Sequence, residues 1–275
     1  MDIAHSNQAT PKYLGYVYQV LIAIEKCFEA KPNETIWIEC FGDVYNGHTY
    51  TEVKHHCEEH NLSSNSKDFW NTLKNLVIED SSQFEEVVLH TTSIISDRSI
   101  FKSWNEVDVE ERFKKIKDFN PCHSTKALYE RIFKEATEDE IKSILSRFTI
   151  KHSCLKVEQQ WGKLIEMGKL RCLEENYRES VLHWVYSYVN KRAMENRYYW
   201  QVNINDFDDA FRFQVNRWGG DKIPFPKYDE QCNLNDVRKF NFLDEYKDIG
   251  IRQTDRGSAS MNILKLRIVK KNWLI

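Results

Sequence analysis

The chain has 275 residues, of which 41% are hydrophobic, and it contains only 9 Gly and 5 Pro. This length and composition predict a globular protein with one large domain or two modest ones, and they exclude collagenous, low-complexity and mostly disordered chains. Lys and Arg total 39 against 42 Asp and Glu, which gives a formal net charge of -3. A protein without net positive charge has no global field that attracts nucleic acid, so any such contact must use a local patch.

Neither the apolar runs nor the cysteines indicate a membrane or secreted protein. The longest apolar run, Val20 to Ile24, is far shorter than the roughly 18 residues that span a bilayer. The amino terminus has no basic segment followed by an apolar one, which a secretion signal requires. The 7 cysteines are scattered without a CxxC pair, a pattern typical of reduced thiols in a cytoplasm. We therefore expect a cytoplasmic protein without a membrane span.

The amino-terminal part of the chain alternates between helical and strand patterns. Apolar residues recur at helical spacing over residues 13–30, and two stretches rich in β-branched and aromatic residues follow at 35–45 and 48–56. Asn46-Gly47 between these stretches is the strongest short-range signal for a two-residue hairpin turn. A helix is expected over 67–80 and a strand over 84–95. This order predicts an α/β core packed around one sheet.

The remaining sequence has mainly helical patterns. Helices are expected at 99–119, 124–136, 138–148, 158–167, 175–189 and 206–215, with one strand at 148–154. The loop at 217–231, which contains Gly and Pro, is the best internal boundary, and two final helices are expected at 235–247 and 258–274. We predict a core over residues 1–155, a helical extension packed on it over 156–220, and a helical C-terminal region over 221–275.

Hairpin geometry places a set of charged residues on one face of the predicted sheet. A two-residue turn pairs Tyr45 with His48 and, in steps of two, Asp43 with Tyr50, Phe41 with Glu52 and Glu39 with Lys54. Side chains alternate across a strand, so Glu39, Asp43, Glu52 and Lys54 converge on one side, away from the packed face. The opposite face, which we expect to bury in the core, contains Ile36, Ile38, Cys40, Val44, Thr49, Thr51 and Val53.

Two of these carboxylates and the lysine fit the needs of phosphodiester hydrolysis. Asp43 and Glu52 are expected within about 8 Å of each other, so both can coordinate one hard cation such as Mg²⁺. The reaction needs charge neutralisation on the phosphoryl oxygens and a positioned water, which Lys54 can orient. Glu39 can support the ligands or bind a second metal. Opposite charges across an exposed strand pair, which stabilise by roughly 0.2 to 1 kcal/mol, explain the same spacing without any activity.

Three stretches together resemble a known family. They are GYVYQVLIAIEKCFEA at 15–30, IECFGDVYNGHTYTEVKHH at 38–56 and FWNTLKNLV at 69–77. The combination resembles the PD-(D/E)xK DNA endonuclease domain, of the Mrr-like branch, that is found in bacterial antiphage effectors of CBASS and Lamassu systems. The family pattern matches Gly15, Tyr18 and Gln19, then Glu39 and Asp43, then Glu52, Val53, Lys54 and His55. Stretches at 144–167 and 198–211 are similar to the helical part that follows the family's nuclease core, so the resemblance covers most of the first 215 residues.

The resemblance implies a restriction-endonuclease-like fold and cleavage of double-stranded DNA with Mg²⁺, for which Mn²⁺ can substitute. It implies Asp43, Glu52 and Lys54 as catalytic residues, with Asp43 and Glu52 as the metal ligands. Gln19, Glu39 and His55 are expected to support them. Many relatives have Gln at the position of Glu52, so the present motif is closer to the general E-x-K form. The core at 1–155 would then be the nuclease.

The resemblance also implies a role in bacterial antiphage defence. CBASS relatives continue into a SAVED domain that binds cyclic oligonucleotides, whereas here one compact helical segment follows the core, as in Lamassu-type systems. In those systems an SMC-like ATPase and a small accessory protein hold the nuclease, which becomes active on release and self-association. We expect the apolar stripe of residues 258–275 to bind a partner or a second copy, or to pack as an ordinary terminal helix.

Further patterns leave alternatives open. A zinc site can be drawn from His55, His56, Cys57 and His60, but the sequence offers no second ligand pair, so a solvent-exposed strand end explains them better. His90 is expected to be a buried, hydrogen-bonded histidine. The basic residues Lys114, Lys115, Lys117, Lys191 and Arg192 can contact the DNA backbone or form solvated helix faces. A docking subunit without activity, or a phosphodiesterase acting on RNA or nucleotides, is compatible with the same site residues.

Overall fold

The structure is a computed structural model that describes residues 9–196 and 198–218. The described residues before 216 form one compact unit. The C-terminal region predicted at 221–275, with its two expected helices, lies outside the described residues.

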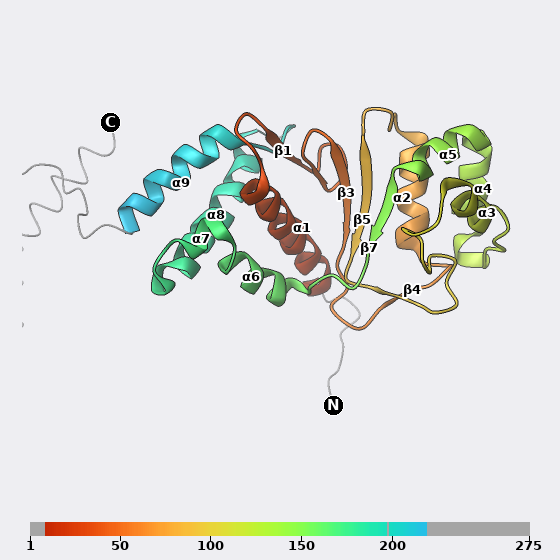
Figure 1. The fold of residues 1–275 in the computed structure, drawn as a ribbon, viewed down its shortest axis with the longest axis horizontal. Coiled ribbons are helices and arrows are strands. Elements are labelled where there is room, and N and C mark those ends of the chain that lie inside the picture. The colour runs from red at the N-terminus through yellow and green to blue at the C-terminus, as the bar shows by residue number, and fades with distance from the viewer. Residues whose placement is uncertain (1–8, 197, 219–275) are drawn as a thin grey trace, which may run out of the picture. The chain divides into compact units, whose positions relative to one another are not determined.

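A six-stranded mixed sheet runs through the centre of this unit (Figure 1). Its strands are β1 (Thr35–Ile38), β2 (Val44–Tyr45), β3 (Thr49–Lys54), β5 (Glu86–Thr91), β7 (Phe148–Lys151) and β8 (Gln201–Asn203), in the spatial order β7-β5-β3-β2-β1-β8. Strands β3, β5 and β7 are parallel, whereas β2, β1 and β8 continue the sheet with antiparallel pairing. A separate two-stranded sheet is formed by β4 (Asn61–Leu62) and β6 (Ile94–Ile95).

Helices cover both faces of the large sheet (Figure 1). On one side lie α1 (Thr10–Glu29), α6 (Val157–Ile165), α7 (Gly168–Arg171), α8 (Glu175–Glu195) and α9 (Ile204–Trp218), and on the other lie α2 (Lys67–Ile78), α3 (Val109–Lys117), α4 (His123–Glu135) and α5 (Glu138–Ser146). The first helix buries Leu21 and Ile24, and the core on the α2 side contains Phe69 and Trp104. A sheet covered on both faces favours continuous apolar runs such as Val87, Val88 and Leu89 in β5. The predicted fold class, an α/β protein with a mixed sheet flanked by helices and a mainly helical C-terminal half, is confirmed for the described residues.

The first predicted strand, over residues 35–45, is in fact two strands. The chain reverses between β1 and β2, which pair with each other as antiparallel neighbours. The reversal is possible because Glu39 and Gly42 have positive φ angles of 55° and 92°, and the Glu39 N–H donates to the Asp43 carbonyl at 3.1 Å. Cys40, which was predicted to be buried on the packed face, is only half-buried because it lies in this turn.

The turn at Asn46-Gly47 connects β2 to β3 in a register two residues away from the predicted one. Tyr45 pairs with Tyr50 instead of His48, because the Oδ1 atom of Asn46 accepts the N–H groups of His48 and Thr49 and closes a longer loop. A shift by two residues preserves the alternation, so each β3 side chain keeps its predicted face. The polar face is not open, however, since Tyr50 is only 3% exposed and belongs to the core on the α2 side. The prediction that only the opposite face is packed is wrong, because helices cover both faces.

Other boundaries also differ from the predicted ones. The helix predicted at 99–119 begins only at Val109, after a series of turns, and Asp108 caps it by accepting the Glu111 N–H at 2.8 Å. The strand β8 was not predicted; it lies within the predicted extension at 156–220 and pairs with β1. The extension therefore adds a strand to the sheet, and the boundary at residue 155 stays a prediction.

No helix in the described part of the chain is both long and apolar enough to cross a membrane.

Arg112 connects several segments on the α2 side of the sheet. Although it is charged, it is only 8% exposed, and its guanidinium donates hydrogen bonds to the carbonyls of Trp104, Leu145 and Phe148 at 2.8 to 3.0 Å. These bonds join α3 to the end of α5 and the start of β7. A buried carbonyl that loses its donor keeps its full desolvation cost, so this residue is expected to be structurally important.

We predict that Arg112→Leu lowers the free energy of unfolding by about 3 kcal/mol, because it leaves buried carbonyl groups without their donor. Urea unfolding followed by circular dichroism measures the change. Arg131→Leu, at an exposed position of α4, is the matched control and should change the free energy by less than about 0.5 kcal/mol. Equal effects of the two substitutions would contradict the role assigned to Arg112.

Candidate active site

Asp43 is held at the point where the pairing between β2 and β3 ends. The β2 strand pairs with β3 only through Val44 and Tyr45, so the edge of β3 beyond Thr51 is not covered by β2. The Oδ2 atom of Asp43 accepts the N–H of Val53 at 2.6 Å and takes the place of a strand partner. This bond fixes the carboxylate beside β3, and only 9% of Asp43 is exposed.

Glu52 and Lys54 extend from β3 into the same cluster. The Nζ atom of Lys54 lies 2.7 Å from Oε1 of Glu52 and 3.9 Å from Oδ2 of Asp43. The Tyr50 hydroxyl donates a hydrogen bond to Oε2 of Glu52 at 2.7 Å. Glu52 is 7% exposed, whereas Lys54 is half-buried. The structure thus brings together the three residues that the sequence selects for catalysis.

Glu39 and Gln19 lie at the rim of this cluster. The Gln19 side chain, which comes from α1, is close enough to the Glu39 carboxylate to lower the pKa of that group. Desolvation and the negative charge of Glu52 raise the pKa of Glu39, and the opposing effects of Gln19 and Lys54 do not cancel this increase. Both flanking residues named from the sequence therefore reach the site.

The cluster contains more negative than positive charge. Burial, together with the charge of Glu52, raises the pKa of Asp43 to about 7, although Lys54 and the Val53 N–H act in the opposite direction. Burial alone would lower the pKa of Lys54, but the charges of Glu52 and Asp43 outweigh it and the pKa of Lys54 is raised. The carboxylates of Glu39, Asp43 and Glu52 thus act on one ammonium group. A hard divalent cation held by carboxylate oxygens would balance this charge, so Asp43 and Glu52 fit a Mg²⁺ site.

Two residues that the sequence analysis did not select shape the cluster. Gly42 has a φ of 92°, and a Cβ atom at this position would overlap the ring of Tyr50. Tyr50 in turn holds Glu52 through its hydroxyl group. The available signal was the Gly-Asp pair that precedes β2, because glycine readily takes the positive φ that a tight reversal needs.

His55 lies on the opposite side of the sheet from the cluster. Its ring packs against the ring of Tyr18, with 4.8 Å between centroids, and its Nε2 atom accepts the N–H of Val157 at 3.4 Å. Because neighbouring residues of a strand point to opposite faces, His55 points away from Lys54, and the expected supporting role is not borne out by its position. His90 is hydrogen-bonded to the Tyr18 hydroxyl at 3.0 Å, as expected, although it is half-buried; burial lowers its pKa to about 4.

The basic residues named as DNA contacts lie on two helices on opposite sides of the sheet (Figure 1). Lys114, Lys115 and Lys117 belong to α3, whereas Lys191 and Arg192 belong to α8. Lys117 forms an ion pair with Glu138 at 2.6 Å, and Lys191 and Arg192 pair with Glu195 at 3.4 and 2.6 Å. The two groups do not form one continuous patch, and their contact with DNA stays a prediction.

No family model and no curated protein matches the chain. Among solved structures, the chain is similar to a SAVED/CARF-domain-containing Cap4 receptor from Moraxella osloensis, with 15% sequence identity and a TM-score of 0.42. The similarity covers 76% of this chain and 50% of the receptor, so the chain spans half the length of that protein. A similarity of this strength supports no conclusion about activity.

The raised pKa of Asp43 predicts how stability depends on pH when divalent metal is absent. Folding raises the pKa of the Asp43 carboxyl to about 7, so the folded state holds this proton more tightly than the unfolded state does. The resulting contribution to the free energy of unfolding is fully present below the ordinary pKa of aspartic acid, and it is lost as the pH rises through about 7. Asn at this position is uncharged and its oxygen can still accept the Val53 N–H. In EDTA at pH 8, Asp43→Asn should therefore raise the unfolding temperature by at least about 2 to 4 °C, and near pH 4 this difference should disappear.

Differential scanning fluorimetry across this pH range measures the effect. Asp139→Asn is a suitable control, because Asp139 is exposed on α5 and its replacement should change little at either pH. If the unfolding temperatures of Asp43→Asn and the wild type depended on pH in the same way, the buried position of the Asp43 carboxylate would be contradicted.

Proposed function

We propose that the chain is a metal-dependent endonuclease of the PD-(D/E)xK type that hydrolyses phosphodiester bonds of double-stranded DNA. The observation that carries this proposal is the meeting of Asp43, from the turn before β2, with Glu52 and Lys54 of β3 in one cluster. Such a set of paired carboxylates and a lysine has the chemistry that phosphodiester hydrolysis needs. The resemblance of the stretches at 15–30 and 38–56 to nuclease effectors supports the same assignment, and it extends the proposal to a Lamassu-like antiphage role in bacteria.

Asp43 and Glu52 would hold Mg²⁺, or Mn²⁺ in its place. The cation would neutralise charge on the phosphoryl oxygens and stabilise the transition state. Lys54 would orient the attacking water and stabilise the developing negative charge through its ammonium group. The Val53 N–H and the Tyr50 hydroxyl fix the positions of the two carboxylates, which keeps the ligands in place before the substrate binds.

A second candidate function is a docking subunit that has a nuclease-like fold and no activity. It is favoured by one feature of the cluster, which is that Lys54 and Tyr50 occupy both oxygens of Glu52 while Val53 occupies an oxygen of Asp43. In that case the cluster would be a buried ion-pair network with a structural role, and it would have no need of a divalent metal.

The test is cleavage of supercoiled and linear plasmid DNA by the purified full chain, with Mg²⁺, Mn²⁺ or EDTA, over a range of protein concentrations. We predict metal-dependent cutting that Asp43→Asn and Lys54→Ala each reduce by at least about 100-fold. Lys126→Ala, at an exposed lysine of α4, is the control and should cut like the wild type. Steep dependence on protein concentration would support activation by self-association, and competition with RNA would separate a DNA nuclease from an RNA phosphodiesterase.

Thermal unfolding separates loss of the site from loss of the fold in these variants. Because Lys54 balances two buried carboxylates, its removal is expected to lower the unfolding temperature in EDTA, and Mg²⁺ should restore part of the loss. Absence of cleavage by the wild type, together with no effect of Mg²⁺ or Mn²⁺ on its unfolding temperature, would contradict the nuclease proposal and favour the docking subunit.

A further inference from the structure

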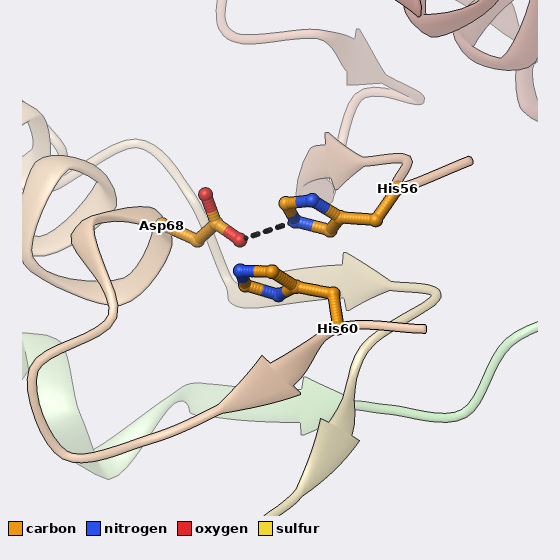
Figure 2. A group of neighbouring side chains, drawn as sticks. All are labelled: His56, His60 and Asp68. Carbon is orange, nitrogen blue, oxygen red and sulfur yellow. Dashed lines mark hydrogen bonds and ion pairs between the residues drawn. The ribbon is translucent and has the colours of Figure 1, made fainter. Parts of the chain in front are cut away.

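A second group of side chains that could hold a metal ion lies beyond the end of β3. His56 and His60 belong to the segment between β3 and β4, and Asp68 lies in the first turn of α2. Figure 2 shows that a ring nitrogen of each histidine faces the Asp68 carboxylate. The Nε2 atom of His56 lies 2.8 Å from Oδ2 of Asp68, and one ligand atom from each of the three residues can be chosen so that all lie within 4.8 Å of one another.

The two imidazole rings are stacked, with 3.7 Å between centroids and 6° between their planes. Stacked rings hold their nitrogen lone pairs in two separate planes, so both nitrogens can bind one ion with the Asp68 carboxylate only after the rings tilt toward each other. Two imidazoles and a carboxylate are a donor set typical of Zn²⁺, whereas Mg²⁺ prefers oxygen ligands. Tetrahedral ligands at Zn²⁺ bond lengths lie roughly 3.3 Å apart, so metal binding requires these side chains to close from their spacing of up to 4.8 Å and the two rings to leave their parallel stack.

The positions of both histidines are fixed by the segment that follows β5. The Nδ1 atom of His60 lies 2.8 Å from the hydroxyl of Ser93, which is itself fully buried and bonded to Thr91. When Nδ1 of His60 donates this bond, Nε2 keeps its lone pair and is free to bind a metal. The main-chain N–H of His56 donates to the Thr92 hydroxyl at 2.8 Å. His60 thus has the ring hydrogen bond that metal-binding histidines usually make, whereas His56 is held through its main chain.

We propose that His56, His60 and Asp68 form a Zn²⁺ site with three protein ligands and a fourth position that faces solvent. The side chains of His56 and Asp68 are 27% and 18% exposed, so an ion can enter. The zinc ion would connect the segment after β3 to the start of α2, immediately beyond Lys54. This site is separate from Asp43 and Glu52, and the proposal does not depend on nuclease activity.

The test uses the full chain without an affinity tag, stripped of metal by a chelator and then titrated with Co²⁺. We expect one Co²⁺ per chain with the intense visible absorption of a tetrahedral site, which Zn²⁺ abolishes by displacement. His60→Ala and Asp68→Asn should lose this absorption. His123→Ala, at an exposed histidine of α4, and Asp43→Asn should both keep it. Ser93→Ala should weaken binding by about tenfold or more, because it removes the partner of the His60 ring.

Two further measurements guard against a variant that fails to fold. Far-ultraviolet circular dichroism should be unchanged in His60→Ala, and His60→Cys should restore Co²⁺ binding because cysteine is also a zinc ligand. Zn²⁺ should raise the unfolding temperature of the wild type and leave that of His60→Ala unchanged. Co²⁺ binding that Asp43→Asn abolishes and His60→Ala preserves would overturn the proposal, as would the absence of tetrahedral Co²⁺ binding by the wild type.

Discussion

The central physical constraint in this protein is the placement of two carboxylates, Asp43 and Glu52, beside a single lysine where little water reaches them. Burial, and after it the negative charge of Glu52, opposes ionisation of Asp43, which is why its pKa rises to about 7. Lys54 compensates part of this charge, and the hydrogen bonds from the Tyr50 hydroxyl and the Val53 N–H compensate another part. The arrangement is more costly than a neutral core would be, and a divalent cation would relieve it. This excess negative charge links the fold to the proposed hydrolytic function.

The surrounding backbone serves this placement. The β2 strand is short, so the edge of β3 beyond it can bind the Asp43 carboxylate instead of another strand. The reversal before β2 requires a positive φ at Glu39. This conformation is unfavourable for a residue other than glycine, and here it places the Glu39 side chain at the rim of the cluster. Helices cover both faces of the sheet, and Asp43 and Glu52 are only 9% and 7% exposed. The fold therefore supplies both the geometry and the low dielectric of the site.

The sequence could predict which side chains meet because alternation along β3 does not depend on the exact register. The Asn46-Gly47 signal gave the wrong pairing, since the Asn46 side chain closes a longer loop, but the error was an even number of residues and left the β3 side chains on their predicted faces. The turn at Glu39 was missed because the apolar pattern continues through it, and Gly42 before Asp43 was its one sequence signal. The pairing of His56 and His60 with Asp68 was also missed, because the aspartate comes from a helix and no spacing rule connects it to the histidines.

Paramagnetic resonance of Mn²⁺ tests most directly whether the cluster of Asp43 and Glu52 holds a divalent cation. Free Mn²⁺ gives a sharp signal that is lost on binding, so titrating the wild type, Asp43→Asn and Glu52→Gln counts the sites. Our account predicts one Mn²⁺ site in the wild-type chain that both substitutions remove and that His60→Ala leaves intact. Equal binding by the wild type and both carboxylate variants, or no binding at all, would contradict it.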